Sequence, residues 1–334
     1  MSRWRRTLAL LTVAVLALAV AAGGAALAWL HRPLDLAADT VELSIEYGTS
    51  PRAVAEQWVA AGVRTSPLFL YEWFRWSGEA RKIRAGSYEI DRGTTPKRLL
   101  AKMVRGDETL ATVRLIEGWT LRQFRAELAH AERLKPDTAA MTDAELMAAL
   151  GAPGTAAEGQ FFPDTYAYSK GSSDLAVLKR AHRALQRQLD AAWADRAPDT
   201  PLKSPDEALT LASIVEKETG VAADRTRVAA VFVNRLRIGM PLQTDPTVIY
   251  GLGPSYAGRL KKKDLQTDTP YNTYTRMGLP PTPIALPGVA SLAATLNPAS
   301  STALYFVSRG DGSSIFSDNL GDHNKAVDKY IRGQ

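Results

Sequence analysis

The sequence predicts an α+β protein in which a single N-terminal transmembrane helix precedes a small folded part and a larger one. Three observations support this fold class. An uncharged stretch runs from Thr7 to Leu30, strand-like alternation of apolar and polar residues recurs at 41–45 and 113–116, and helices follow both strands. The length of 334 residues also suits two domains, because a domain usually holds roughly 100–200 residues.

The N-terminal apolar stretch predicts a membrane anchor. Arg3, Arg5 and Arg6 precede it and His31 follows it. At about 1.5 Å per helical residue its length spans a bilayer core of roughly 30 Å. Basic residues favour the cytoplasmic side, so the N-terminus is expected in the cytoplasm and the rest of the chain outside it. The expected segments are a cytoplasmic tail at 1–6, a transmembrane helix at 7–30 and a linker at 31–39.

A cleaved signal peptide is the alternative reading of the same stretch. The run Ala26, Leu27, Ala28 resembles a small-residue cleavage site. The apolar stretch is long for a signal peptide, however, and contains no shorter apolar region set apart from the rest. We therefore favour an uncleaved anchor.

Residues 40–108 predict a small α+β module. Its pattern reads strand, two helices, strand and helix, and no acidic residue in it is set on an apolar face. The expected elements are a strand at 41–45, a helix capped by Ser50, an aromatic-rich helix at 68–76, a strand at 86–90 and a helix from Thr95 to near Gly106.

Residues 109–334 predict a second and larger α+β domain. It begins with a strand at 113–116, and a turn-rich aromatic loop at 158–166 separates its first helices from a long amphipathic helix at 173–194. Near its end, 304–308 and 314–316 flank a Gly-Asp-Gly turn and predict a hairpin, more typical of core than of a site.

One helix in this domain carries an acid in an unusual place. Ser204 begins a capping box and Gly220 stands where a C-terminal glycine belongs, so the helix is bracketed at both ends. At about 100° per residue, Leu211, Val215 and Glu218 fall within one narrow apolar stripe. Glu218 is therefore expected to be desolvated near a helix C-terminus, and both effects raise the pKa of a carboxyl.

A protonated Glu218 could donate its proton to a glycosidic oxygen as the bond breaks. The competing interpretation is a helix-end glutamate that reaches solvent or pairs with Arg225 or Arg227, since structural ion pairs also perturb such groups. Glu216 projects to a different face of the helix and is expected to be a solvated partner of a basic residue.

The segment 243–298 gathers side chains of the kinds that bind sugars. Aromatic rings contact the C–H faces of a sugar, while planar amides and carboxylates bind its hydroxyls. An ordinary proline-rich surface loop explains the same composition equally well. The candidates are Gln243, Thr244, Asp245, Tyr250, Tyr271, Asn272, Thr273, Tyr274 and Asn297.

Composition argues against several other functions. The chain has no cysteine, which excludes thiolate metal sites and cysteine nucleophiles. Its four histidines are scattered without chelating spacing, so we expect no metal and no cofactor. The net charge of +6 is modest and partly flanks the apolar stretch, so we expect no nucleic-acid partner.

A series of ordered motifs closely resembles the YceG-like endolytic murein transglycosylases. The resemblance extends over essentially the whole chain after the apolar stretch, and such an ordered series is very specific. The motifs are LASIVEKET at 211–219, FVNRL at 232–236, LQTDPTVIYG at 242–251, YNTY at 271–274, GLPP at 278–281, LYFV at 304–307 and HNK at 323–325, with EG at 158–159 and PDTY at 163–166 upstream.

The resemblance implies a function for the chain and roles for its residues. The glutamate matching Glu218 is the family's catalytic residue, 40–108 is a LysM-like peptidoglycan-binding module, and 109–334 is the catalytic domain in the periplasm. Such enzymes cleave between N-acetylmuramic acid and N-acetylglucosamine inside a glycan strand and leave a 1,6-anhydro end. The implied partners are glycan strands and penicillin-binding synthases at the inner membrane. The substrate-binding candidates are Gln243, Asp245, Tyr271, Asn272 and Tyr274.

Two other functions remain open at this stage. A wall-binding scaffold for a peptidoglycan synthase would use the anchor and the first module, but it does not need an acid on an apolar stripe. A hydrolytic muramidase would need a second carboxyl at about 5–10 Å from the first, and Asp245 and Asp164 are the candidates.

Overall fold

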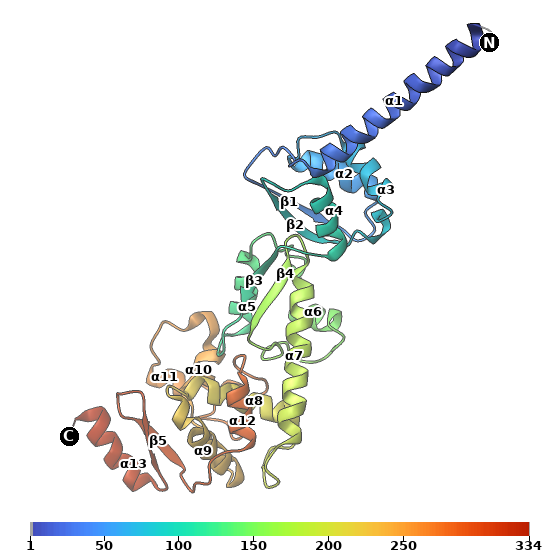
Figure 1. Cartoon of the computed structure of the whole chain (residues 1–334). Helices are drawn as coiled ribbons and strands as arrows, with labels where there is room; N and C mark the ends of the chain where they lie inside the picture. Colours follow the sequence, from blue (N-terminus) through green and yellow to red (C-terminus); the bar gives the residue numbers. More distant parts are fainter. Residues whose placement is uncertain (1–2, 334) are drawn as a thin grey trace. The chain divides into compact units, whose positions relative to one another are not determined.

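The computed structural model describes residues 3–333 and divides into two compact units (Figure 1). The first unit comprises Met1–Ala111 with Ala167–Ser172, and the second comprises Thr112–Tyr166 with Ser173–Gln334. The division runs through β3 (Leu110–Arg114) and β4 (Thr165–Ser169), which pair as a two-stranded sheet. Each unit is considered by itself below.

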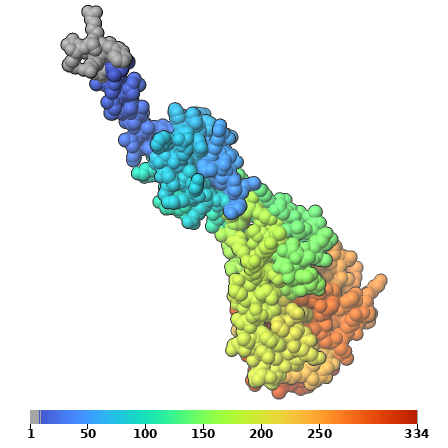
Figure 2. Space-filling model, turned by 90° about the vertical axis from the view of Figure 1, so that its right-hand side faces the viewer, coloured from blue at the N-terminus to red at the C-terminus, as the bar shows by residue number. Residues whose placement is uncertain are grey.

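The first unit begins with the helix α1, Arg3–His31. The part of α1 from Leu10 to His31 has a mean hydropathy of 2.4, and its most apolar residues are not buried by the rest of the protein. Figure 2 shows the blue length of α1 without other segments packed around it. By length and composition this helix can cross a membrane, as the sequence predicted.

The rest of the first unit has one core, which lies between an antiparallel pair of strands and three helices. The strands β1 and β2 pair antiparallel with Thr40 opposite Asp91 and Ile45 opposite Gly86. Side chains from both strands and all three helices form the core, with Trp58, Phe74 and Tyr88 among those almost fully buried. The elements are β1 Thr40–Ile45, α2 Pro51–Ala61, α3 Pro67–Trp76, a 3₁₀ turn at Ala80–Lys82, β2 Gly86–Asp91 and α4 Pro96–Arg105.

The segment 167–172 belongs to this compact unit, although no local pattern in the sequence indicates it. Lys170 forms an ion pair with Glu42 of β1 at 2.7 Å, and the Ser44 hydroxyl donates to the Lys170 carbonyl at 2.7 Å. These partners lie far apart in the sequence, so neither periodicity nor capping signals could place them together. The first compact unit therefore includes 167–172 in addition to the residues up to Ala111.

The second unit is mainly helical. Its helices are α5 Leu121–His130, α6 Asp143–Ala149, α7 Asp174–Ala194, α8 Pro205–Glu218, α9 Arg225–Arg237, α10 Asp245–Leu252, α11 Lys262–Gln266, α12 Val289–Leu296 and α13 Leu320–Val327. Short turns lie at Ala222–Asp224, Gly253–Ser255 and Asp328–Arg332. The predicted hairpin is confirmed as β5 Tyr305–Ser308 and β6 Ser314–Ser317, antiparallel to each other.

The helix α8 lies at the centre of this unit and contacts α7, α9, α10 and α12. Every residue from Ala208 to Val215 is buried, including Thr210 and Ser213. The predicted single apolar stripe is therefore too narrow a description, because neighbouring helices cover α8 on all sides. The Ser213 hydroxyl is satisfied internally, since it donates to the Thr210 carbonyl and accepts from the Ile284 N–H. The first and last turns of α8 emerge from the core.

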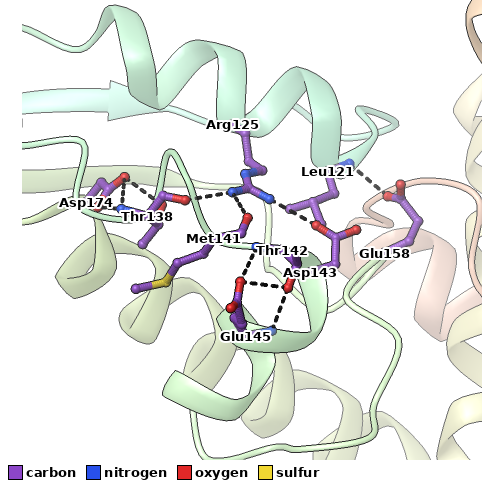
Figure 3. A network of polar contacts seen from close by, with 9 residues as sticks. All are labelled: Leu121, Arg125, Thr138, Met141, Thr142, Asp143, Glu145, Glu158 and Asp174. Carbon is purple, nitrogen blue, oxygen red and sulfur yellow. Dashed lines mark hydrogen bonds and ion pairs between the residues drawn. The ribbon is translucent and has the colours of Figure 1, made fainter.

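A polar network fixes the chain that connects α5, α6 and α7 (Figure 3). The Arg125 guanidinium donates to the Thr138 and Met141 carbonyls at 2.7 Å and pairs with Asp143 at 3.0 Å. Buried Asp174, at the start of α7, accepts from the Thr138 N–H at 3.1 Å and from its hydroxyl at 2.6 Å. This irregular segment is held by side chains that satisfy its backbone groups.

Candidate active site

Glu218 is the last residue of α8, where the helix leaves the core. Ser204 caps the other end as predicted, accepting from the Glu207 N–H at 3.2 Å. At the C-terminus Thr219 turns to extended backbone, and its N–H donates to the Val215 carbonyl at 3.1 Å. The helix thus ends at Glu218, two residues before Gly220. The Glu218 side chain is half-buried at this end of the helix.

The two oxygens of Glu218 have different surroundings. Oε1 accepts a hydrogen bond from the Thr244 hydroxyl. Among residues 3–333, no side chain or backbone group donates to Oε2. One oxygen is therefore held in place while the other is open to a ligand.

Burial raises the pKa of Glu218, and this is the largest influence on the group. The negative charge of Asp245 raises the pKa further, whereas the hydrogen bond from Thr244 and the positive charge of Arg235 lower it. The predicted direction is confirmed. A carboxyl in these surroundings keeps its proton to a higher pH than an exposed glutamate does.

The Thr244 hydroxyl binds Glu218 instead of capping a helix. It stands at the N-cap of α10, where a threonine hydroxyl normally accepts from the first turn of the helix. Its side chain makes no such capping bond, because the hydroxyl is directed at Glu218 instead. A capping residue that gives up its cap is the kind of local departure expected at a functional site.

Two other threonines fix the backbone around Thr244. The Thr244 N–H donates to the Thr273 hydroxyl at 3.1 Å, and the Thr247 hydroxyl donates to the Thr244 carbonyl at 2.8 Å. The hydroxyls of Thr247 and Thr273 lie 2.9 Å apart, and all three threonines are buried. We call Thr244, Thr247 and Thr273 the threonine cradle.

Gln243 precedes the cradle in a rare backbone conformation. Its φ of 49° lies in the left-handed region, which residues with side chains seldom adopt. Its N–H donates to the Thr273 carbonyl at 3.1 Å, so the cradle also holds this turn. The Gln243 side chain is exposed, beside Thr244 in the sequence.

Asp245 and Tyr274 form a second polar pair at the site. The Tyr274 hydroxyl donates to Asp245 Oδ1 at 2.6 Å. Burial and the neighbouring carboxylates Asp245 and Glu218 raise the pKa of Tyr274, so this phenol stays a donor. The structure therefore brings Asp245 and Tyr274 into the surroundings of Glu218.

Asn272 and Tyr271, the other two of the five substrate-binding candidates, form no hydrogen bond with Glu218 in the described part of the chain. Asn272 is buried, and its amide donates to the carbonyls of the preceding loop and accepts from the Tyr274 N–H at 2.9 Å. The Tyr271 hydroxyl lies 2.8 Å from that of Thr282, and its ring packs edge-on against Tyr250 at 4.9 Å. In this conformation Asn272 shapes the loop that carries Tyr274.

Arg235 is a site residue for which the sequence analysis assigned no role. It is buried on α9, and its guanidinium donates to the carbonyls of Leu304 and Leu242 at 2.7 Å. Its charge lies close enough to favour the ionised form of Glu218. Two features of the sequence point to Arg235: its place in the FVNRL motif, and the presence of an arginine inside an otherwise apolar helix.

Glu216 differs from its prediction. It was expected to face solvent, but it is half-buried and its Oε2 accepts from the Gly288 N–H at 3.0 Å. Gly288 is the N-cap of α12, and that helix packs against α8. The exposed face of α8 was misjudged because α12 covers it.

A cavity of about 990 Å³ in the same unit is lined by Lys217 but not by Glu218. It also contains Glu158, whose Oε1 accepts from the Leu121 N–H at 2.9 Å and whose Oε2 accepts from the Tyr250 hydroxyl at 3.1 Å. Burial raises the pKa of Glu158 to about 7. Within residues 3–333, no group of three acidic or histidine side chains could hold a metal ion.

Comparisons with known proteins converge on one family. The model of the YceG-like family matches residues 43–329. A Bacillus subtilis (strain 168) protein named endolytic murein transglycosylase is 32% identical over 314 residues, covering 87% of this chain and 85% of that protein. A Streptococcus pneumoniae protein (serotype 2, strain D39) of the same name is 27% identical over 289 residues, covering 75% of this chain and 51% of its own. The crystal structure of a putative yceG-like protein from Listeria monocytogenes matches with a TM-score of 0.55 at 27% identity, covering 86% of this chain and 98% of that one.

Proposed function

Because this chain belongs to the YceG-like family, we propose that it cleaves peptidoglycan glycan strands as an endolytic lytic transglycosylase, with Glu218 as its general acid and base. The observation that carries the assignment is the geometry of Glu218. It has a raised pKa, one oxygen held by Thr244 and the other oxygen open. These are the properties that a proton donor to a glycosidic oxygen requires.

The proposed reaction uses one carboxyl in two steps. Protonated Glu218 donates to the oxygen between N-acetylmuramic acid and N-acetylglucosamine, and the bond from the anomeric carbon to that oxygen breaks. The C6 hydroxyl of the same muramic acid then attacks the anomeric carbon, and the Glu218 carboxylate takes its proton. No water is consumed, the product is a 1,6-anhydro end, and Glu218 is protonated again.

The neighbours of Glu218 have distinct proposed roles. Burial, supported by the charge of Asp245, keeps the proton on Glu218 until the glycosidic oxygen takes it. We assign Gln243, Asp245 and Tyr274 to direct contact with the sugar, because exposed Gln243 and Asp245 flank Thr244 and the Tyr274 hydroxyl donates to Asp245. We assign Tyr271 and Asn272 to the same substrate loop, where they hold Tyr274 in place.

A second proposal concerns location and partners. α1 would anchor the chain in the inner membrane with its N-terminus in the cytoplasm and both units in the periplasm. The first unit would serve as a LysM-like peptidoglycan-binding module, supported by the antiparallel strands that bracket α2 and α3 in the chain. This placement suits action on nascent strands beside a penicillin-binding synthase. A reporter that works only in the cytoplasm should be inactive when fused after Gln334.

Product analysis tests the reaction directly. The full-length protein in detergent is incubated with purified glycan strands, and the new ends are identified by mass spectrometry. We expect ends that are lighter by one water than reducing ends. Reducing muramic acid ends would instead indicate a hydrolase that uses Asp245 as a second carboxyl. Binding without any new ends would indicate a scaffold.

A further inference from the structure

An apolar groove of about 670 Å³ lies in the first unit between α1 and α3. One wall includes Ala26 and Trp29 of α1, and the other consists of Phe69, Glu72, Trp73 and Trp76 of α3. The Trp76 indole N–H donates to Glu72 Oε2 at 3.0 Å, so the carboxylate in this wall is satisfied by a neighbouring side chain. The rings of Trp29 and Phe69 meet edge to face with their centroids 6.1 Å apart. The C-terminal end of α1 and one side of α3 therefore form one largely apolar surface.

The helix α3 has two apolar faces, although packing in its own unit needs only one. Leu70 and Phe74 are fully buried in the core of the unit. On another side, Phe69 is 59% exposed and Trp76 is 77% exposed, and their spacing of seven residues places them on one stripe. Large aromatic side chains left uncovered in this way indicate an interaction surface.

The position of the groove along α1 indicates what covers it. The candidate membrane span ends at His31, and Ala22 precedes that end by nine residues. At about 1.5 Å per residue, Ala22 lies roughly 13 Å below the end of the span along the helix axis. Trp29 is only two residues, or about 3 Å, from that end, so Phe69, whose ring meets Trp29, lies at the lipid boundary, and the groove extends from there toward Ala22 within the outer leaflet.

We propose that the Phe69 and Trp76 face of α3 inserts into the outer leaflet of the membrane, so that the first unit rests on the bilayer. This inference rests on the proposed anchoring by α1. Aromatic residues favour the interface between acyl chains and headgroups. Exposed Arg32, which follows α1 directly, suits the headgroup phosphates beside it. The Arg75 guanidinium lies 5.7 Å from the centre of the Trp76 ring and is paired with Glu72 at 3.4 Å.

Such insertion would determine where the enzyme works. A module held at the membrane surface by two elements, α1 and α3, has much less freedom than one attached by a flexible linker. Its glycan-binding capacity would then be directed at strands close to the membrane. Newly made strands are the substrate class that this placement favours.

The absence of cysteine allows a direct test, because a single introduced cysteine takes a spin label without removing any native thiol. Trp76→Cys reports on the proposed contact, and Phe69→Cys repeats it at a second position. Leu18→Cys, 71% exposed on α1, is the reference for lipid, and Tyr47→Cys, 99% exposed in the same unit, is the reference for water. The full-length protein is placed in bilayer discs that contain anionic lipid.

Collision of each nitroxide with oxygen, which concentrates in lipid, is compared with collision with a water-soluble nickel chelate. We expect labels at 76 and 69 to favour oxygen several-fold more than the label at 47 does. Values at 76 and 69 equal to those at 47, with a lipid value at 18, would overturn the inference and leave the anchor intact. Exclusion of both reagents at 76 would also overturn it, since a protein would then cover the groove. A water value at 18 would overturn the anchor and the inference together.

Discussion

Glu158, which is buried, and Glu218, which is half-buried at the end of α8, are two glutamates of the same unit with pKa shifts in the same direction and different hydrogen-bond partners. Burial raises the pKa of both. The short helix α10 serves both, because Thr244 at its N-cap binds Glu218 and Tyr250 near its end binds Glu158. In the described part of the chain, Glu158 has donors on both oxygens, whereas Glu218 has a donor on one only.

This difference separates a structural carboxyl from one that can act on a ligand. Glu158 links the first N–H of α5 to α10, and its lone pairs are used within the protein. Glu218 keeps one oxygen open at the end of a buried helix. A raised pKa alone therefore reports burial, and the unoccupied oxygen is what distinguishes the proposed acid.

Replacing the two glutamates should give opposite results, and Glu218→Gln should give the larger effect. Glutamine keeps the shape and can still accept from Thr244, but it has no proton to transfer. Since general acid and base catalysis contributes roughly 10²–10⁴-fold, we expect at least about a hundredfold loss of anhydro ends with strand binding retained. Product formation is measured by mass spectrometry and binding by co-sedimentation with glycan strands.

Asp206→Asn is the matched control for Glu218→Gln, because Asp206 is an exposed acid on the same helix. Its activity should stay near that of the parent. Glu216→Gln is a more demanding control, since it keeps an acceptor for Gly288 and removes only the charge. If Glu216→Gln were inactive while Glu218→Gln still formed anhydro ends, the assignment of the acid would be wrong.

Thr244→Val should have the next largest effect, because it frees the oxygen of Glu218 that is now held. A hydrogen bond to a charged group contributes about 1.5–3 kcal/mol, so we expect a loss in kcat on the order of tenfold or more. Thr244 lowers the pKa of Glu218, so its removal should raise that pKa. The alkaline limb of the pH profile, where the acid loses its proton, should move to higher pH.

Thr244→Ser tests whether the effect of Thr244→Val comes from the loss of the hydroxyl. Serine keeps the donor and should restore both kcat and the position of the alkaline limb. A Val variant with reduced kcat and an unmoved pH profile would mean that Thr244 acts only through the packing of α10.

Glu158→Gln should leave activity within a few-fold of the parent and change stability instead. The folded pKa of about 7 lies above the ordinary value of 4.5. The folded state therefore holds this proton while the unfolded state loses it, and stability falls as pH rises between these values, by roughly 3 kcal/mol. Urea unfolding at pH 5 and pH 8 should show a smaller loss in Glu158→Gln than in the parent. An inactive but folded variant would make Glu158 a second catalytic group.

The sequence predicted Glu218 but not what distinguishes it from Glu158. Capping signals and periodicity placed α8 and its terminal acid, because those signals are local to the helix. The partners of Glu158 lie at Leu121 and Tyr250, far away in the sequence, so its burial could not be read from its surroundings in the chain. The hydrogen-bond partners of Arg235 could not be predicted for the same reason, since they include the carbonyl of Leu304.

The elements of the first unit were more predictable than the second unit's interior. β1, β2 and the proline-started helices have strong local signals, namely alternation and N-caps at Ser50 and Thr95. The second unit surrounds α8 with helices from distant segments, which explains why Glu216 was wrongly expected to face solvent. Local patterns thus predicted the position of Glu218 at the end of α8, and long-range packing determined the hydrogen-bond partners of both glutamates.

Tyr250→Phe should have the smallest effect and tests the structural side of the comparison. The Tyr250 hydroxyl stabilises the ionised form of Glu158, so its loss should raise the Glu158 pKa above about 7. The pH-dependent loss of stability should then extend to higher pH, in addition to a general loss of about 0.5–1.5 kcal/mol from the missing hydrogen bond. Tyr271→Phe is the control, because its hydroxyl meets Thr282 rather than a carboxyl and its ring packs against Tyr250. It should lose similar stability at every pH, measured by urea unfolding from pH 5 to pH 9. Identical pH profiles for the two variants would show that Tyr250 does not control the proton on Glu158.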